Sequence, residues 1–147
     1  MLKKENPMSV GAYATAAYYM EAKRAQAQAM IDAKEVILKV AAEFEKVTGR
    51  KYGLFEEYMM DDAEVVIVSY GTIGRIAKSV AKMARNKGIK AGVFRPITLW
   101  PFPYAELAKW AKKETKLFFT VEMSAGQMIE DVRLAVEGRC PVKFYGR

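Results

Sequence analysis

Residues 64–75 constrain the fold of this chain more than any other stretch. Val65–Val68 is a run of four β-branched residues, and Gly71 and Gly74 follow it after Ser69 and Tyr70. Such a run cannot alternate between core and water, so both faces of the strand must be covered. The two glycines relieve crowding at a sharp turn, and Thr72 is placed to cap the first free N–H groups of a following helix. The stretch therefore predicts a buried parallel strand that turns into a helix.

The same rhythm continues to the end of the chain. Apolar runs that predict strands occur at residues 65–68, 91–94, 117–121 and 142–145. Helical patterns lie between them: the first ends at Gly88, the second spans residues 104–113, and the third ends at Gly138. Alternation of this kind predicts an α/β fold, a three-layer α/β/α sandwich on a mostly parallel sheet.

The first part of the chain differs in character. Residues 12–48 are helical in pattern, with an apolar stripe in the second half, Asp32 as a plausible N-cap and Gly49 as the C-cap. Residues 51–62 form a linker that is unusually rich in large apolar side chains. We expect the linker to pack back on the domain, although an exposed patch for a partner is the other interpretation. The predicted division is a helical arm and linker over 1–60 and an α/β domain over 61–147.

Two residue types are nearly missing, and this excludes several kinds of site. The chain has no His and one Cys, Cys140. A Ser-His-Asp triad, a His-ligated zinc or a Cys-ligated iron-sulfur cluster cannot be built from this chain alone. Cys140 is expected to be a small core or interface residue in a reducing compartment without disulfides. No secretory segment and no apolar run long enough to span a bilayer is present, so the sequence predicts a cytoplasmic protein without a membrane partner.

The net charge of +7 favours an anionic partner. Nucleic acid is the less favoured candidate. Basic residues such as Lys78, Lys82 and Arg85 are interleaved with apolar positions, a pattern typical of the solvent-exposed faces of helices. An acidic protein, for example a small electron carrier, suits the same charge. A homo-oligomer is also left open.

If the strands are parallel, their carboxyl ends gather one set of candidate residues along one rim of the sheet. This rim set comprises Tyr70, Gly71, Thr72, Arg95, Glu122, Ser124, Gly126 and Gln127. Two helix N-termini would point N–H groups into the same crevice, which suits an anion. The rim is therefore the best candidate site in the chain.

Several observations weaken a catalytic or nucleotide-binding interpretation of the rim. The spacing of Gly71 and Gly74 is not G-x-G-x-x-G, and no acidic residue ends the second strand. Arg95 and Glu122 are expected either to pair with each other or to hold a neighbouring subunit, and a lone carboxylate is weak evidence for acid–base chemistry. We assign no catalytic, cofactor-binding or metal-binding residue. A stand-alone module that binds an anion or a nucleotide remains the alternative function.

The rigid aromatic segment at residues 100–103 is the other candidate for contacts. Trp100 or Phe102 is expected to plug the core, to dock an adjacent domain, or both.

Three ordered motifs resemble a known family. They are residues 62–72 (DAEVVIVSYGT), 95–103 (RPITLWPFP) and 121–133 (VEMSAGQMIEDVR). Together they resemble the carboxyl-terminal domain of the large subunit of 2-oxoacid:ferredoxin oxidoreductases, most of all the 2-ketoisovalerate type. Residues 7–12, 18–21 and 49–52 resemble the segment that joins the first domain of that family to the second.

The resemblance implies a transketolase carboxyl-terminal-like fold within a larger enzyme. In that family thiamine diphosphate, Mg²⁺, iron-sulfur clusters and CoA serve the oxidation of a 2-oxoacid, and ferredoxin takes the electrons. The preceding domain and the partner subunits carry the cofactor motifs, and no catalytic residue transfers to this chain. We therefore expect a fragment that is silent alone, binds no cofactor alone, and has the missing domain and other oxidoreductase subunits as partners.

Overall fold

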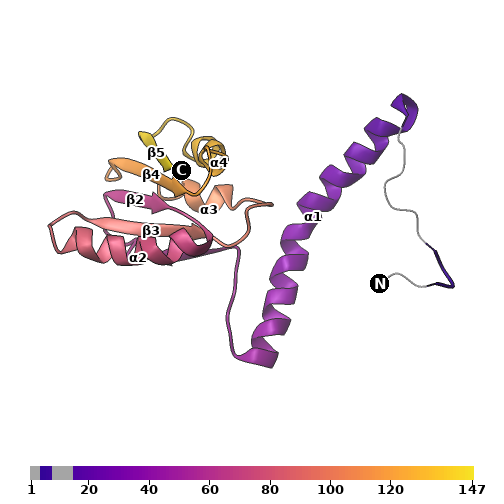
Figure 1. Cartoon of the computed structure of the whole chain (residues 1–147), viewed down its shortest axis with the longest axis horizontal. Coiled ribbons are helices and arrows are strands. Elements are labelled where there is room, and N and C mark those ends of the chain that lie inside the picture. Colours follow the sequence, from indigo (N-terminus) through magenta and orange to yellow (C-terminus); the bar gives the residue numbers. More distant parts are fainter. Residues whose placement is uncertain (1–3, 8–14) are drawn as a thin grey trace.

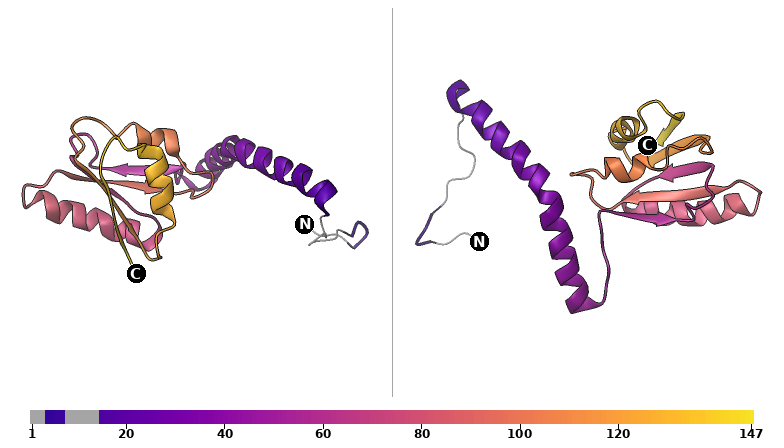
Figure 2. Two further views of the ribbon diagram at one scale, coloured as in Figure 1. Left: turned by 90° about the horizontal axis from the view of Figure 1, so that it is seen from above. Right: turned by 180° about the vertical axis from the view of Figure 1, so that it is seen from behind.

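The computed structural model describes residues 4–7 and 15–147. A long helix, α1 (Ala16–Thr48), stands beside an α/β body (Figures 1 and 2). The predicted beginning of this arm near residue 12 lies outside the described residues. The body contains β1 (Phe55–Tyr58), β2 (Val65–Val68), α2 (Gly71–Arg85), β3 (Ala91–Pro96), α3 (Tyr104–Ala108), β4 (Leu117–Glu122), α4 (Met128–Val136) and β5 (Val142–Gly146).

The body is built on one five-stranded sheet with the order β1-β3-β2-β4-β5. The strands β2, β3, β4 and β5 are parallel, and β1 pairs antiparallel with β3 at the edge. The predicted mostly parallel sheet is confirmed, and each predicted strand is present. The strand β1 was not predicted, because it lies within the stretch read as a linker.

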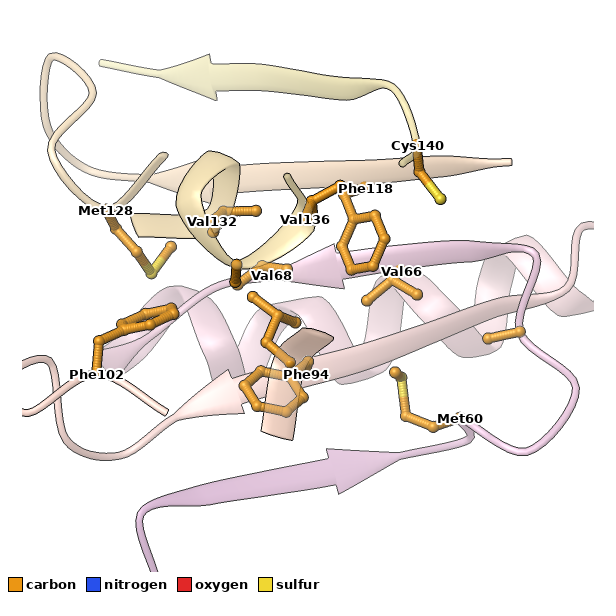
Figure 3. Close-up of a cluster of buried hydrophobic side chains, with 13 residues drawn as sticks. Met60, Val66, Val68, Phe94, Phe102, Phe118, Met128, Val132, Val136 and Cys140 are labelled. Carbon is orange, nitrogen blue, oxygen red and sulfur yellow. The ribbon is translucent and has the colours of Figure 1, made fainter. Parts of the chain in front are cut away.

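Helices cover both faces of this sheet, as the uniformly apolar β2 requires. Val66 and Val68 point into a cluster that α3 and α4 close, and Ile67 points into a smaller cluster beneath α2. Figure 3 shows the larger cluster, where Phe94 and Phe118 lie on either side of the β2 valines. The predicted α/β/α layering is therefore confirmed.

The linker packs down on the body, as expected. Leu54 and Met60 are almost fully buried at its two ends. Gly92 on β3 lets the linker approach, because a Cβ atom there would lie 2.6 Å from the Met59 carbonyl oxygen and 2.8 Å from Met60 Sδ. The close approach closes the amino end of the larger core cluster.

The arm is one continuous helix rather than two. The prediction that Asp32 is an N-cap is wrong, because Asp32 lies inside α1. Its Oδ1 accepts a hydrogen bond of 2.8 Å from Gln28 Nε2, one turn earlier in the helix. The Gly49 C-cap is confirmed by a left-handed φ of 69° and by its N–H, which donates to the Glu45 carbonyl oxygen at 2.8 Å.

The arm has one half-buried row of side chains and no fully buried residue. That row is formed by Met30, Ala33, Lys34, Ile37, Ala41 and Glu45. Its polar anchor joins Lys34 Nζ to Glu106 Oε1 on α3 at 3.0 Å. The arm is thus fixed mainly by its junction with β1 and by this contact.

The helix predicted for residues 104–113 ends early, at Ala108. The chain turns after it, and the Thr115 hydroxyl donates to the Trp110 carbonyl oxygen at 2.6 Å within the turn. Trp110 Nε1 donates to Glu57 Oε1 on β1 at 2.6 Å. The indole is therefore held toward the β1 edge of the sheet, and the turn redirects the chain to β4.

Candidate functional site

The carboxyl ends of β2, β3 and β4 bring the predicted rim set to one end of the sheet, because these three strands are parallel. The set does not form one shared crevice of free polar groups. Its charged members are engaged within the chain, in two separate networks around Glu122 and Arg95.

Glu122 at the end of β4 holds the N-terminus of α4. Its side chain is buried, with the residue only 3% exposed, and its carboxylate accepts from the N–H groups of Met128 at 3.1 Å and Ile129 at 3.2 Å. A carboxylate at a helix N-terminus satisfies donors that have no partner inside the helix and interacts favourably with the helix dipole. The role of Glu122 in this structure is therefore that of a buried helix cap.

The neighbouring loop completes this cap. The Ser124 hydroxyl donates to the Glu122 carboxylate at 2.8 Å and accepts from the Gly126 N–H at 3.4 Å. Gly126 has a φ of 104°, a conformation that glycine adopts readily. Gln127 is exposed and occupies the N-cap position of α4 without a side-chain hydrogen bond.

The occupied cap also bears on the anion-binding alternative. An incoming anion at the α4 N-terminus would meet the Glu122 carboxylate, a negative charge that already uses the available N–H groups. Like charges in one site repel, and the more so where water is excluded. This end of the rim is therefore a poor anion site.

At the end of β2, the turn differs from the prediction. Tyr70 is the N-cap residue of α2, and Thr72 lies inside the helix with no capping hydrogen bond, so the predicted cap at Thr72 is wrong. The helix begins two residues earlier than predicted, because Gly71 takes a left-handed φ of 55° and completes the turn itself. Thr72 is exposed and Tyr70 half-buried, so both side chains reach the surface at this corner.

Arg95 on β3 lies against Gly74 in the first turn of α2 and reaches the adjacent edge strand β1. Its NH1 lies 3.2 Å from Glu56 Oε2 on β1, and Lys78 of α2 pairs with the other oxygen of the same carboxylate. The hydrogen bond from Lys78 lowers the pKa of Glu56 more than burial raises it, and the hydrogen bond from Arg95 lowers it further. Glu56 therefore bridges β1, β3 and α2.

The expected pair between Arg95 and Glu122 is not formed, since each has other partners. Sequence reasoning also missed Glu56 and Lys78 as members of the Arg95 network. Neither residue belongs to a motif, and the antiparallel pairing that sets Glu56 opposite Arg95 connects residues far apart in sequence.

The two aromatic candidates in residues 100–103 have separate positions. Phe102 is 5% exposed and packs into the larger core cluster, whereas Trp100 is 62% exposed. Trp100 lines a largely apolar groove of about 700 Å³ between this loop and α1, with Met30 and Ile31 on the helix side. Phe102 thus anchors the loop, and Trp100 is the member of the pair that faces the surface.

Within residues 4–7 and 15–147, no three Cys, Asp or Glu side chains come together as metal ligands. Cys140 is buried, and burial raises the pKa of its thiol, so it is a poor thiolate ligand. The described residues therefore do not fit Mg²⁺ with a diphosphate, or an iron-sulfur cluster. None of the described helices has the length and hydrophobicity to cross a bilayer.

Comparison with known proteins covers most of the chain. Residues 63–147 match the family described as pyruvate:ferredoxin oxidoreductase core domain II. A ketoisovalerate oxidoreductase subunit, VorB, of Methanothermobacter marburgensis is 51% identical over 81 residues, which are 55% of this chain and 23% of that protein. A pyruvate synthase subunit, PorA, of Pyrococcus abyssi is 39% identical over 118 residues, which are 80% of this chain and 30% of that protein.

A solved structure supports the fold. A split gene transketolase, described as an inactive beta4 tetramer, aligns with a TM-score of 0.57 and 24% identity over 66% of this chain and 34% of that chain. The fold is thus transketolase-like. This chain matches only about a quarter to a third of the length of its curated relatives.

Proposed function

Because this chain belongs to the pyruvate:ferredoxin oxidoreductase core domain II family, we propose that it acts as one part of a 2-oxoacid:ferredoxin oxidoreductase. In that reaction a 2-oxoacid loses CO₂, its two-electron oxidation reduces ferredoxin, and the acyl group is transferred to CoA. The 51% identity to a ketoisovalerate oxidoreductase subunit supports 2-ketoisovalerate as the substrate of the complex. The family match is the observation that carries the proposal.

Within the complex we assign this chain an assembly role and no step of the chemistry. The support is the rim itself, where the Glu122 carboxylate caps α4 and Arg95 is paired with Glu56. Groups committed to such contacts are not available as an acid, a base or an anion clamp. Tyr70, Gly71 and Thr72, together with exposed Gln127 beside the Ser124 and Gly126 loop, form the proposed contact rim for a neighbouring domain.

Thiamine diphosphate, Mg²⁺, iron-sulfur clusters and CoA belong, in this proposal, to other parts of the enzyme. Thiamine diphosphate supplies the carbanion chemistry of decarboxylation when it is bound, and the clusters carry single electrons onward. The partners are the preceding domain and the other oxidoreductase subunits, and ferredoxin is reached through the complex. The proposed location is the cytoplasm, a reducing compartment that suits the free Cys140.

The arm provides the second proposed contact with the rest of the enzyme. It carries exposed apolar side chains on the faces that do not meet the body: Tyr18, Tyr19, Met20, Val36, Val40 and Val47. Apolar patches of this kind on a soluble protein mark contact surfaces. With Trp100 at the groove, they give a neighbouring domain an apolar surface next to the rim.

Reconstitution tests the proposal. The purified chain is mixed with the remaining domain and subunits of a ketoisovalerate oxidoreductase that lacks this region, and ferredoxin reduction is followed with 2-ketoisovalerate and CoA. We expect turnover only in the mixture, and none from the chain alone. Turnover by the chain alone would contradict the silent role, and failure of the chain to enter the complex would contradict the assignment itself.

A further inference from the structure

The arm α1 is tied to the body by one polar contact. Within the described residues, the ion pair between Lys34 and Glu106 is the one hydrogen-bonded link between α1 and residues 54–147. The two side chains are 44% and 18% exposed. Pairs that reach the surface in this way stabilise only weakly, because water and salt screen them. The ion pair therefore orients α1 without fixing it rigidly.

The arm stands off the body toward both of its ends from this contact. Toward the N-terminus of α1 lies the groove of about 700 Å³, with residues 100–104 as its other wall. Toward the C-terminus lies a second hollow of about 530 Å³, between Leu38 and residues 51–56. Lys34 lines both of them. The helix thus meets the body near Lys34 and has open space on either side, as its position in Figure 1 suggests.

Residues 49–53 are the loosest part of the connection between α1 and β1. They belong to no helix or strand, and none of them has a backbone hydrogen bond to the body. Gly49 has no atom within 4 Å of the position that a Cβ would occupy. The fixed part begins at Leu54, which is buried and whose carbonyl oxygen accepts from the Ile97 N–H at 2.8 Å.

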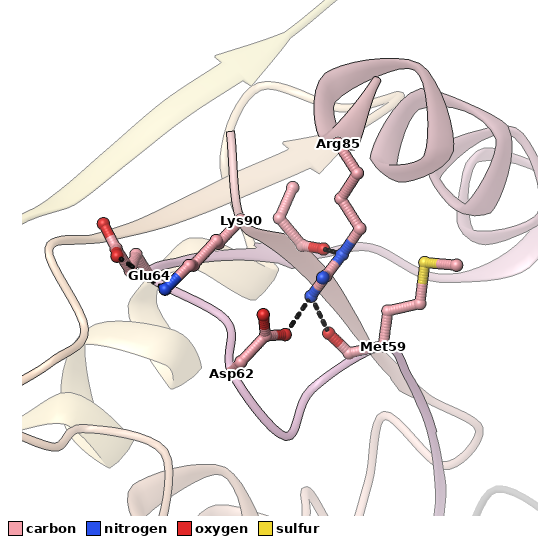
Figure 4. Close-up of polar contacts among 6 residues, drawn as sticks. Met59, Asp62, Glu64, Arg85 and Lys90 are labelled. Atoms are coloured by element: carbon pink, nitrogen blue, oxygen red, sulfur yellow. Dashed lines mark hydrogen bonds and ion pairs between the residues drawn. The ribbon is translucent and has the colours of Figure 1, made fainter. Parts of the chain in front are cut away.

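The other end of the linker is held much more firmly. Arg85 on α2 donates to the Asp62 carboxylate at 2.6 Å and to the Met59 carbonyl oxygen at 2.8 Å (Figure 4). Met60 is buried in the larger core cluster. A few residues outside regular structure are what a hinge requires. Movement of α1 relative to the sheet is therefore concentrated in residues 49–53.

The two walls of the groove are apolar and face water. Ile31 on α1 is 68% exposed, and Trp100 on the opposite wall is 62% exposed. Residues 97–104 contain no charged side chain, so contact between the walls would bury no charge of this loop. Lys23 can keep its ammonium group in water at the end of its long side chain. Removal of both apolar walls from water is favourable.

We propose that α1 turns on residues 49–53 and closes the groove in the free chain, so that Ile31 rests on Trp100. The arm of the same chain is favoured over a separate molecule as the occupant, because a tethered contact loses less translational freedom. In the enzyme the neighbouring domain replaces this contact, a step that rests on the function proposed above. The arm thus covers Trp100 until that domain binds.

A distance measurement between two spin labels tests the closure. The labels are attached to the full chain at Ala29→Cys on α1 and Ala105→Cys on α3, two exposed positions that do not line the groove, while Cys140 is buried. We expect pulsed electron paramagnetic resonance to show a second, shorter distance besides that of the open groove. A single distance equal to the open-groove value would overturn the proposal.

Two matched variants test which side chains close the groove. Ile31→Asp should abolish the shorter distance, because closure would bury a charge without a partner. Val36→Asp is the control and should keep it, since Val36 is 58% exposed but does not line the groove. Equal effects of the two substitutions would overturn the proposed contact.

The fluorescence of Trp100 gives a second readout without labels. The chain has two tryptophans, so Trp110→Phe leaves Trp100 as the only one. We expect acrylamide to quench Trp100 at least about twofold more strongly in Ile31→Asp than in Val36→Asp, because at least about half of the molecules are closed in the control. Urea unfolding shows that both variants are folded. Equal quenching in the two would overturn the closure.

The same pair of labels separates this inference from the proposed function. The labelled chain is mixed with the remaining domain and subunits, and size-exclusion chromatography shows whether it enters the complex. We expect the shorter distance to disappear from the incorporated chain, and its persistence there would overturn the exchange of contacts. A chain that stays outside the complex would contradict the proposed function, whereas closure is decided by the free chain.

Discussion

Arg95 lies directly against Gly74: a Cβ atom on that glycine would be 2.9 Å from Arg95 Cδ and 3.0 Å from its Cγ. Because Gly74 has no side chain, α2 leaves room for the Arg95 side chain, which pairs with Glu56. A glycine that looks like part of a turn motif in the sequence is, in the structure, the partner of an arginine on a neighbouring strand.

The first prediction concerns this contact. In an open helix position Gly→Ala gains about 0.5–1 kcal/mol. We expect Gly74→Ala instead to lower the free energy of unfolding by about 1–2 kcal/mol, because the methyl group displaces Arg95. Urea unfolding of the wild type and of Gly74→Ala measures the two free energies of unfolding. In an Arg95→Ala background the same substitution should become neutral or stabilising, and an unchanged loss there would show that the contact is not the cause.

Removing the buried charge of Glu122 should destabilise α4. Glu122→Gln keeps the shape but turns an NH₂ group toward the N–H donors of Met128 and Ile129 or leaves one weakly bonded. We expect a loss of about 1.5–3 kcal/mol in urea unfolding. Glu130→Gln, on the exposed first turn of the same helix, is the control and should change stability by less than about 0.5 kcal/mol. Comparable losses in both would argue against a specific cap.

The Glu56 bridge should make stability depend on pH. Its pKa is lower in the folded chain than the ordinary value of 4.5, so its contribution is present above about that pH and is lost as the pH falls through the folded-state value. Because the Glu56 side chain is 38% exposed, screening limits the contribution to less than about 1 kcal/mol.

We therefore expect Glu56→Gln to be slightly less stable than the wild type at pH 7, and the difference to shrink in strong acid. Urea unfolding across this pH range measures it, and added salt should reduce the difference at pH 7. A difference that grows on acidification would have the wrong sign for this bridge.

The aromatic pair in residues 100–103 should separate stability from assembly. Phe102→Ala opens a cavity in the larger core cluster and should cost about 3–5 kcal/mol. Trp100→Ala should change unfolding by less than about 1 kcal/mol because its side chain is mostly exposed. If Trp100 contacts a neighbouring domain, as proposed, its loss should instead lower the yield of reconstituted complex. Wild-type yield from Trp100→Ala would remove it from the interface.

The parts of the fold that could be predicted are those with local signals. The four β-branched residues Val65–Val68 predict a strand that is covered on both faces. Gly49 predicts the end of α1, because glycine readily takes the left-handed conformation found there. The strand β1, with the sequence FEEY, lacks such a signal, because its two central acidic residues hide the alternation. It becomes a strand through pairing with β3, about 40 residues away in sequence. Such pairing depends on tertiary contacts.

The candidate site was predictable in position but not in its contacts. Parallel strands place Tyr70, Arg95 and Glu122 at one end of the sheet by topology alone. The partner of each charge depends on side-chain reach: Glu122 turns back to its own helix, and Arg95 crosses to Glu56. The sequence predicts caps at Asp32 and Thr72 because both residue types favour that position. In the structure both lie inside helices, since α1 continues through Asp32 and α2 already begins at Gly71.

The attachment of α1 at one end gives it the mechanics of a lever. Its 33 residues extend about 50 Å, so a rotation of about 10° at the junction with β1 would displace the far end by roughly 9 Å. The contact between Lys34 and Glu106 lies well along this length and opposes such a swing. The orientation of the whole arm therefore depends on its junction with β1 and on the contact between Lys34 and Glu106.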